Sequence, residues 1–381
     1  MAVYLDCAST TPTEPSVADI MRRFIEVDYG NAASPIHDYG TFARMAVDHA
    51  RGQIAKLVKV RRDDVIFTSG ATEANNLAIL GLREYGQQSG RRHLICSAIE
   101  HKAVLEPLEA LTRSGFEMTL VPVGSDGRMI VAELQKALRP DTLLVSTMQV
   151  NNETGTIQPL TEIAAVLSDH HTYWHVDAAQ GFGKEFNNIT LPRIDMISIS
   201  GHKIYGPKGI GALITRKRDG EPPPLKQLIY GGDQEQGLRP GTLPVPLIAG
   251  LGEAARCALR RHSERLEKVT SIRAQALTAL AKLNPVINSA PEQSLPHFLN
   301  ISLPGIPSTT AIKALAETIA ISSTSACTSH TTAPSYVLEA MGRAEAEITS
   351  ALRFSWCHLT EDVDWEAVVA ILNNLQNQTE R

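Results

Sequence analysis

Asp195-Met-Ile-Ser-Ile-Ser-Gly-His-Lys203-Ile-Tyr-Gly-Pro-Lys-Gly-Ile-Gly-Ala212 is the stretch of sequence that decides the fold. Residues 195–200 are largely apolar and predict a buried strand, and the glycines that follow predict sharp turns. We therefore expect this strand to end at a pocket, with His202 and Lys203 facing into it.

A second strand upstream points to the same pocket. In the segment His175-Val-Asp-Ala-Ala-Gln180, we expect an apolar strand that ends on the carboxylate of Asp177. Pyridoxal phosphate needs an amine that forms an imine with its aldehyde and a carboxylate that pairs with its ring nitrogen. Lys203 and Asp177 supply these two groups, so the two strands together predict a pyridoxal phosphate site.

Further out, strand-like apolar runs alternate with helical stretches. The runs are Val65–Thr68, His93–Cys96, Thr119–Val123, Leu143–Thr147, Tyr173–Val176, Met196–Ile199 and Gly211–Thr215. This alternation predicts an α/β fold with a buried, mainly parallel seven-stranded sheet, whose active groups lie at the carboxyl ends of the strands. After about Pro244 the pattern changes and predicts a smaller α/β domain. We place the large domain at residues 14–250 and the small domain at residues 1–13 and 251–381.

Composition excludes several classes of protein. The 381 residues include 36 basic and 41 acidic side chains, a net charge of -5, which argues against direct binding of nucleic acid or of an anionic membrane. No apolar run reaches the ~18 residues of a membrane-spanning helix, and the N-terminus lacks a signal-peptide pattern, so we expect a cytoplasmic protein. The five cysteines include no CxxC pair, which argues against a disulfide framework and against a metal site.

Polar residues follow several of the predicted strands. The turn Ser69–Glu73 precedes a helix, and its amides and the Thr72 hydroxyl can hold a phosphate, although a plain helix cap is the alternative. His101 follows the next strand and can stack on a planar cofactor and carry protons. Asn152 and Gln180 carry amides that can reach the ring oxygen of the cofactor. Each of these features alone more often has a structural role, and it is their combination that favours a cofactor site.

Two further residues have chemistry that suits a substrate. Cys327 lies in 321–335, a segment rich in hydroxyl side chains and poor in apolar ones, so we interpret it as an exposed nucleophilic thiol on a mobile loop. A small buried cysteine is the alternative, and only His330 lies near enough in sequence to lower the thiol pKa. Arg353 is a single arginine in an apolar strand, where it can hold an α-carboxylate or form a structural ion pair.

Taken together, these motifs resemble the cysteine desulfurases of the class V aminotransferase group. The resemblance runs nearly end to end and rests on Tyr4–Pro12, Gly30–Ser34, Ser69–Glu73, Glu100–Val104, Asn151–Gly155, His175–Gln180, Ser200–Lys203, Gly237–Thr242 and Ser325–Thr328. The sequence Ser-Ala-Cys-Thr-Ser at 325–329 resembles the subgroup with a mobile cysteine loop. Residues 97–109 further resemble the desulfurases of bacterial DNA phosphorothioation.

The resemblance implies a fold type I pyridoxal phosphate enzyme that converts L-cysteine to L-alanine. A persulfide would form on Cys327 and pass to an acceptor protein, either an iron-sulfur scaffold or a component of tRNA or DNA thiolation. The catalytic residues would be Cys327, Lys203 and His101. The cofactor would be held by Ala71, Thr72, His101, Asn152, Asp177, Gln180, Ser200, His202 and Lys203, and by Thr242 from the second subunit of a homodimer. The substrate would be held by Asn31, Asn152 and Arg353.

The sequence also departs from the family pattern and leaves alternatives open. Cys7 and Ser9 stand where asparagine and alanine are common, which could alter the cleft. A selenocysteine lyase or another class V lyase or transaminase would share the cofactor site, but transamination needs no thiol, so Cys327 favours a desulfurase. A non-catalytic sulfur-relay scaffold would not need Lys203 together with an aspartate and a histidine suited to the cofactor.

Overall fold

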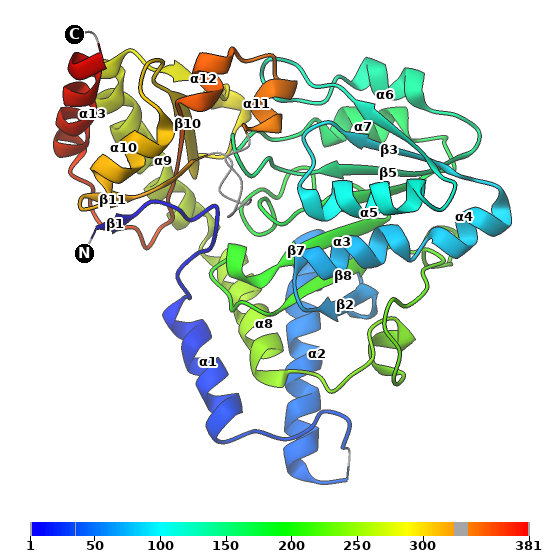
Figure 1. The fold of residues 1–381 in the computed structure, drawn as a ribbon. Helices are drawn as coiled ribbons and strands as arrows, with labels where there is room; N and C mark the ends of the chain where they lie inside the picture. Colours follow the sequence, from blue (N-terminus) through cyan, green and yellow to red (C-terminus); the bar gives the residue numbers. More distant parts are fainter. Residues whose placement is uncertain (1, 35, 324–333, 380–381) are drawn as a thin grey trace.

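The computed structural model describes residues 2–34, 36–323 and 334–379, and its largest sheet has seven strands (Figure 1). The strands are β2 (Val65–Thr68), β3 (His93–Ser97), β4 (Glu117–Val121), β5 (Thr142–Met148), β6 (Tyr173–Asp177), β7 (Met196–Ser200) and β8 (Gly211–Thr215). They lie in the order β2-β8-β7-β6-β5-β3-β4. β8 is antiparallel to both of its neighbours, and the other pairs are parallel. The predicted α/β fold with a mainly parallel sheet is confirmed.

Helices cover both faces of this sheet because its strands are apolar on both sides. Ile66 belongs to an apolar cluster with α3 (Ala71–Leu80) and α5 (Lys102–Thr112), whereas its neighbour Phe67 packs in the cluster of α2 and α8. The other helices up to residue 260 are α1 (Pro15–Glu26), α2 (Asp38–Val58), α4 (Arg83–Ser89), α6 (Val131–Ala137), α7 (Leu160–Val166) and α8 (Val245–Arg260). Within the described ranges, no helix combines the length and the apolar character that crossing a bilayer requires.

A smaller antiparallel sheet is built from later residues. Its strands are β9 (Val286–Ile287), β10 (Phe298–Ser302), β12 (Ser322–Ser323) and β13 (Ala351–Ser355), in the order β12-β13-β10-β9. The surrounding helices are α9 (His262–Leu280), α10 (Ser308–Leu315), α11 (Tyr336–Ala340), α12 (Glu345–Thr349) and α13 (Trp365–Thr379). Residues of β10, β13, α9, α10 and α13 share one apolar core with Leu5.

The N-terminus pairs with this later part of the chain. β1 (Val3–Tyr4) lies parallel to β11 (Ile319–Ala320), and Asp6 bridges to Ser355. These contacts bring residues 3–6 beside β13, and the predicted domain border at residue 250 falls within helix α8. The domain boundaries themselves stay a prediction.

The turn after β7 fixes the direction of the chain near Lys203. The Gly201 amide donates to Ile210 O at 2.9 Å, and the Gly206 amide donates to Gly201 O at 3.0 Å. A Cβ atom on Gly201 would lie 2.8 Å from the carbonyl oxygen of Pro207, closer than non-bonded atoms approach. Glycine is therefore required here for the chain to turn back sharply and direct the following residues toward the end of the sheet.

Candidate active site

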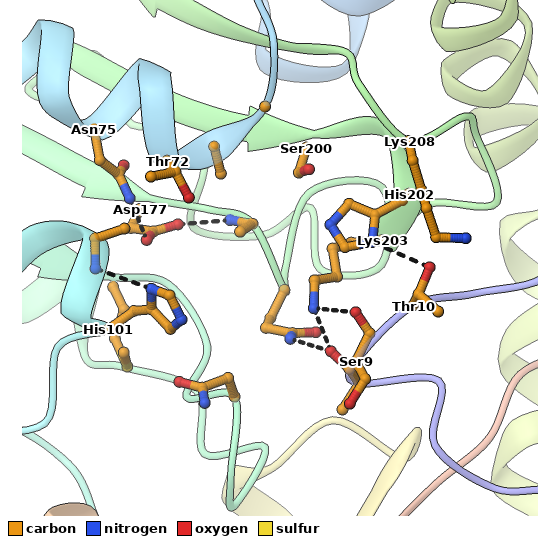
Figure 2. Close-up of a pocket in the computed structure, with 18 of the residues that line it drawn as sticks. Ser9, Thr10, Thr72, Asn75, His101, Asp177, Ser200, His202, Lys203 and Lys208 are labelled. Carbon is orange, nitrogen blue, oxygen red and sulfur yellow. Dashed lines mark hydrogen bonds between the residues drawn. The ribbon is translucent and has the colours of Figure 1, made fainter. Parts of the chain in front are cut away.

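A cavity of about 520 Å³ opens at the carboxyl ends of β5, β6 and β7, where the predicted site residues meet (Figure 2). Its volume lies within the range of ligand pockets, roughly 300–1,000 Å³. The predicted residues that line it are Ala71, Thr72, His101, Asn152, Asp177, Gln180, Ser200, His202, Lys203 and Arg353. Residues from six separate parts of the chain are thus brought together.

The Lys203 amine lies inside this cavity and contacts the N-terminal segment. Lys203 ends the short helix that directly follows β7. Its Nζ donates to Ser9 O at 2.8 Å and also to Ala8 O (Figure 2). A contact between residues almost two hundred positions apart holds the amine at the cavity wall.

The Asp177 carboxylate is fixed by two hydrogen bonds at the end of β6. Its Oδ2 accepts from Asn75 Nδ2 at 2.8 Å, and its Oδ1 accepts from the amide of Ala179 at 2.9 Å. The residue is 6% exposed. Each carboxylate oxygen keeps a further lone pair, so the group can accept from a ring N–H in the cavity.

The opposite end of the cavity suits a phosphate group. Helix α3 begins there after Gly70, which provides no side-chain cap, so the first amides of the helix can bind an anion. The Thr72 and Ser200 hydroxyls lie beside them (Figure 2). Burial, with the nearby charge of Lys203, lowers the pKa of His202 to about 4, so this histidine is neutral at pH 7.

His101 is oriented by the backbone of the helix that it caps. Its Nδ1 accepts from the amide of Ala103 at 3.1 Å, at the N-terminus of α5. A neutral ring with this contact carries its proton on Nε2. Figure 2 shows that second ring nitrogen turned toward the middle of the pocket, where it can exchange a proton with a bound molecule.

Arg353 reaches the cavity from β13 with its guanidinium already hydrogen-bonded. Its Nη1 donates to Asn152 O at 2.9 Å, and its Nη2 donates to Asp6 Oδ1 at 2.9 Å and to Ser9 Oγ at 2.8 Å. The residue is 1% exposed. The guanidinium is therefore rigidly held at the edge of the pocket.

Two predicted residues lie elsewhere, and a third falls outside the described residues. Asn31 and Thr242 line a separate cavity of about 390 Å³ beside α2, and the fold of a single chain does not bring them to Lys203. Cys327 lies outside the described residues, so its predicted position and mobility stay predictions.

Sequence reasoning also missed two residues that contact the site. Ser9 follows no periodic pattern, and the sequence marks it only as a departure from the family pattern that could alter the cleft. Asn75 gives a signal, because it is a polar residue between the apolar residues Ala74 and Leu77 of α3.

The residues present fit pyridoxal phosphate. Asn152 Oδ1 and Gln180 Oε1 are buried at the cavity and have no hydrogen-bond partner among the described residues, which indicates that a polar ligand completes the site. Lysine and arginine side chains outnumber carboxylates in the lining by three to two, which suits an anionic group; these residues are Lys203, Lys208, Arg353, Glu73 and Asp177. The Lys203 amine and the fixed Asp177 carboxylate face the same space.

Comparison with known proteins decides the family. The model of the family described as aminotransferase class-V matches residues 3–368. The chain belongs to this family. A cysteine desulfurase IscS of Methylococcus capsulatus is 43% identical over 368 residues, which are 96% of this chain and 90% of that protein. The mitochondrial cysteine desulfurase of Saccharomyces cerevisiae is 40% identical over 373 residues, which are 98% of this chain and 74% of that protein.

Solved structures of this class V family agree with the sequence relatives. A NifS-like protein has a TM-score of 0.89 at 35% identity and covers all of both chains. DndA from Streptomyces lividans has a TM-score of 0.81 at 47% identity and covers 93% of this chain and 99% of that one. This class V family member is a pyridoxal-phosphate-dependent cysteine desulfurase, and the predicted family, cofactor and activity are confirmed.

Proposed function

We propose that Lys203, His101 and Cys327 are the catalytic residues that convert L-cysteine to L-alanine. The observation that carries this proposal is the single cavity lined by Lys203, His101 and Asp177 at the strand ends. Bound pyridoxal phosphate supplies an electron sink that acidifies the Cα–H bond of the substrate. Lys203 would hold the cofactor through its amine, and once released, the Lys203 amine would remove the Cα proton of the substrate.

The sulfur then moves to the protein. The Cys327 thiolate attacks the substrate sulfur, so that an S–S bond forms while the C–S bond of the substrate breaks. The product is a persulfide on Cys327, and the remaining three-carbon skeleton takes up protons to become alanine. His101 Nε2, which faces the pocket, carries a proton in these steps. The persulfide sulfur passes on to an acceptor protein.

The remaining pocket residues hold the cofactor and the substrate. Ala71, Thr72, Ser200 and His202 bind the phosphate end, where free helix amides add donors. Asp177 pairs with the ring nitrogen. Asn152 and Gln180 bind the ring oxygen, and Asn152 and Arg353 hold the substrate carboxylate. Asn31 lines the other cavity, so it would join them only from a second subunit.

A first experiment tests the tether. Borohydride reduction should link the cofactor covalently to the wild-type chain and not to Lys203→Ala, as measured by the mass of the intact chain. Lys208→Ala is the matched control, because Lys208 lines the same cavity and should leave the link intact. A Lys203→Ala chain that still gains the mass of the cofactor contradicts the assignment.

A second experiment tests the nucleophile. Cys327→Ser should keep the absorption spectrum of the bound cofactor and lose at least 100-fold in sulfide release from L-cysteine, a loss of ~2.7 kcal/mol in transition-state stabilisation. Cys257→Ser is the control, because that thiol lies in α8 and does not line the cavity. Sulfide release by Cys327→Ser at the wild-type rate would exclude the persulfide route.

We also propose a homodimer with shared sites. Exposed apolar side chains gather around the end of α1 and the start of α2, which project from the body of the molecule in Figure 1. They are Ile25, Val27, Tyr29, Ile36, Tyr39, Phe42 and Met45, and we call them the α1–α2 apolar surface. The second cavity, with Asn31 and Thr242, lies beside it. A second copy that covers this surface would present Thr242 to the cofactor phosphate of its partner.

For the acceptor we propose a component of DNA phosphorothioation. The observation that favours it is the 47% identity to DndA, together with the resemblance of residues 97–109. Transfer of ³⁵S from Cys327 to proteins encoded beside this gene, followed by identification of the labelled protein, tests the proposal. Label on an iron-sulfur scaffold or on a tRNA-thiolation protein instead would contradict the proposed acceptor and identify the labelled protein as the acceptor.

A further inference from the structure

The Arg353 guanidinium has a limited number of donors left for a substrate. Both hydrogens of Nη2 are in use, one on Asp6 Oδ1 at 2.9 Å and one on Ser9 Oγ at 2.8 Å. One hydrogen of Nη1 is bound to Asn152 O at 2.9 Å. The buried Nε has no hydrogen-bond partner among the described residues. The free donors are thus Nε–H and one hydrogen of Nη1.

These two free donors do not lie on one edge of the guanidinium. A carboxylate binds arginine through two parallel hydrogen bonds, either to Nε and Nη2 or to Nη1 and Nη2. Either edge includes Nη2, which Asp6 and Ser9 occupy. A substrate carboxylate can therefore bind in this way only when one of these two residues releases its hydrogen bond.

Ser9 is the residue whose chemistry permits the exchange. Asp6 is an ion pair with Arg353 and, when ionised, can only accept hydrogen bonds. The Ser9 hydroxyl accepts from Nη2, but it can also donate, and no group among the described residues accepts its proton. Rotation of the hydroxyl replaces a contact with Arg353 by a hydrogen bond to an incoming carboxylate.

The backbone of Ser9 contacts the other reactive group of the site. Its carbonyl oxygen accepts from Lys203 Nζ at 2.8 Å (Figure 2). Ser9 therefore contacts both this amine and the Arg353 guanidinium. An α-amino acid carries its amine and its carboxylate on the same carbon. Ser9 therefore lies against both groups that the two polar ends of such a substrate would meet.

We propose that Ser9 is a substrate-binding residue that forms, with Arg353, a two-residue receptor for the α-carboxylate. The carboxylate takes the Nη2 hydrogen that Ser9 held, and the Ser9 hydroxyl donates to its second oxygen. Asp6 keeps its hydrogen bond to the other hydrogen of Arg353 Nη2, and its charge offsets that of Arg353. The attraction between Arg353 and the carboxylate is then weaker, so the hydrogen bond from Ser9 contributes more to substrate affinity. The proposal rests on the proposed role of Arg353 in holding the substrate.

The test compares a ligand with and without the carboxylate. The holoenzyme is titrated with L-alanine and with ethylamine, and binding is followed by the absorption spectrum of the cofactor. Ser9→Ala should weaken L-alanine about tenfold, as expected for a hydrogen bond to a charged group, and leave ethylamine within twofold of wild type. Ser9→Thr, which keeps the hydroxyl, should restore most of the lost affinity.

Two further variants, Thr10→Val and Arg353→Lys, separate this role from others. Thr10→Val removes a neighbouring hydroxyl that contacts His202 and not Arg353, so the ratio of the two affinities should stay that of wild type. Wild-type affinity of Ser9→Ala for L-alanine overturns the proposal, as does an equal loss for both ligands, which would indicate a structural role. If Arg353→Lys alone weakens L-alanine, Arg353 holds the carboxylate without Ser9. If neither variant weakens it, the carboxylate binds elsewhere and both assignments fail.

Discussion

Glu100 is a buried carboxyl group directly before His101, and burial raises the pKa of this carboxyl group from its ordinary 4.5 to about 8. Its Oε1 accepts from Ser97 Oγ at 2.5 Å and from the Met148 amide at 2.8 Å, while Oε2 has no partner among the described residues. The group thereby joins the ends of β3 and β5. It is protonated in the folded protein at pH 7 and ionised in the unfolded chain.

This difference predicts a pH dependence of stability. Between pH 4.5 and 8 the folded state binds the extra proton, so the contribution of Glu100 is fully present below pH 4.5 and is lost as the pH rises through 8. Glu100→Gln mimics the protonated form and should remove this slope, a change on the order of 2–4 kcal/mol between pH 5 and pH 8.5. Urea midpoints at the two pH values measure it, with the exposed Glu117→Gln as control. Parallel pH profiles of wild type and Glu100→Gln would rule the explanation out.

The residues that sequence could identify are those that end a predictable strand. Asp177 and Lys203 follow apolar runs, and parallel strands bring such positions to one edge. The contacts of Ser9 with Lys203 and Arg353 could not be predicted, because they depend on how the N-terminal segment crosses between the two sheets. The cavity that Thr242 lines could not be predicted either, because the sequence pattern does not show which segments of the fold lie beside it.

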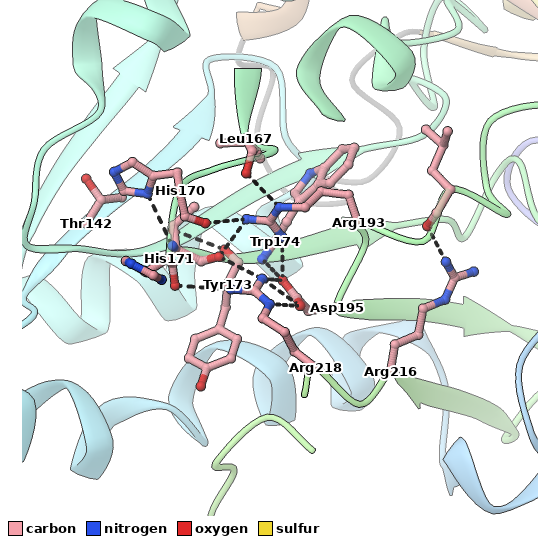
Figure 3. Close-up of polar contacts among 12 residues, drawn as sticks. Thr142, Leu167, His170, His171, Tyr173, Trp174, Arg193, Asp195, Arg216 and Arg218 are labelled. Atoms are coloured by element: carbon pink, nitrogen blue, oxygen red, sulfur yellow. Dashed lines mark hydrogen bonds and ion pairs between the residues drawn. The ribbon is translucent and has the colours of Figure 1, made fainter. Parts of the chain in front are cut away.

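At the scale of elements, Asp195 joins the starts of β6 and β7 to the chain beyond β8 (Figure 3). Its carboxylate accepts from Arg193 Nη1 at 2.9 Å, from Arg218 Nη2 at 2.5 Å and from the Trp174 amide at 2.7 Å. The side chain is 6% exposed. Removal of its charge would leave two partly buried guanidinium groups without their carboxylate.

We therefore expect Asp195→Asn to be strongly destabilising. The loss in the free energy of unfolding should be about 3 kcal/mol, since breaking a buried ion pair leaves uncompensated charge. Asp141→Asn is the matched control, because Asp141 also pairs with an arginine, at 2.7 Å, but its side chain is 38% exposed. That variant should lose less than ~1 kcal/mol. Urea unfolding followed by circular dichroism gives both values, and equal losses would contradict the argument.

The accuracy of the predicted strands follows their burial. Val65–Thr68 and Gly211–Thr215 are buried throughout, and their predicted bounds are those observed. β4 is an edge strand with largely exposed side chains, so its apolar pattern is weak and the predicted run 119–123 lies two residues late. The antiparallel direction of β8 has no periodic signal, because a fully buried strand is apolar in either direction.

At the scale of the whole molecule, residues from both sheets line the cavity around Lys203. Asn31 and Thr242, the two predicted residues missing from it, line the other cavity. The large sheet provides Asp177 and Lys203, and the smaller sheet provides Arg353 from β13. The α1–α2 apolar surface lies beside the cavity that holds the two missing residues. The proposed dimer across this surface would bury the apolar side chains, and their removal from water would drive association.

Shared sites have a consequence that independent sites do not. Lys203→Ala and Thr242→Val chains should each form homodimers with little activity, the second because a hydroxyl to the cofactor phosphate is lost. In a heterodimer of the two, the site built on the Thr242→Val chain keeps its own Lys203 and receives an intact Thr242 from its partner. Co-expression with two different affinity tags, followed by purification through both, should therefore restore about half of the wild-type activity per dimer. Independent sites would give a heterodimer with only the mean activity of the two homodimers, and Ile36→Glu, which places a charge on the α1–α2 apolar surface, should abolish the restoration by preventing assembly.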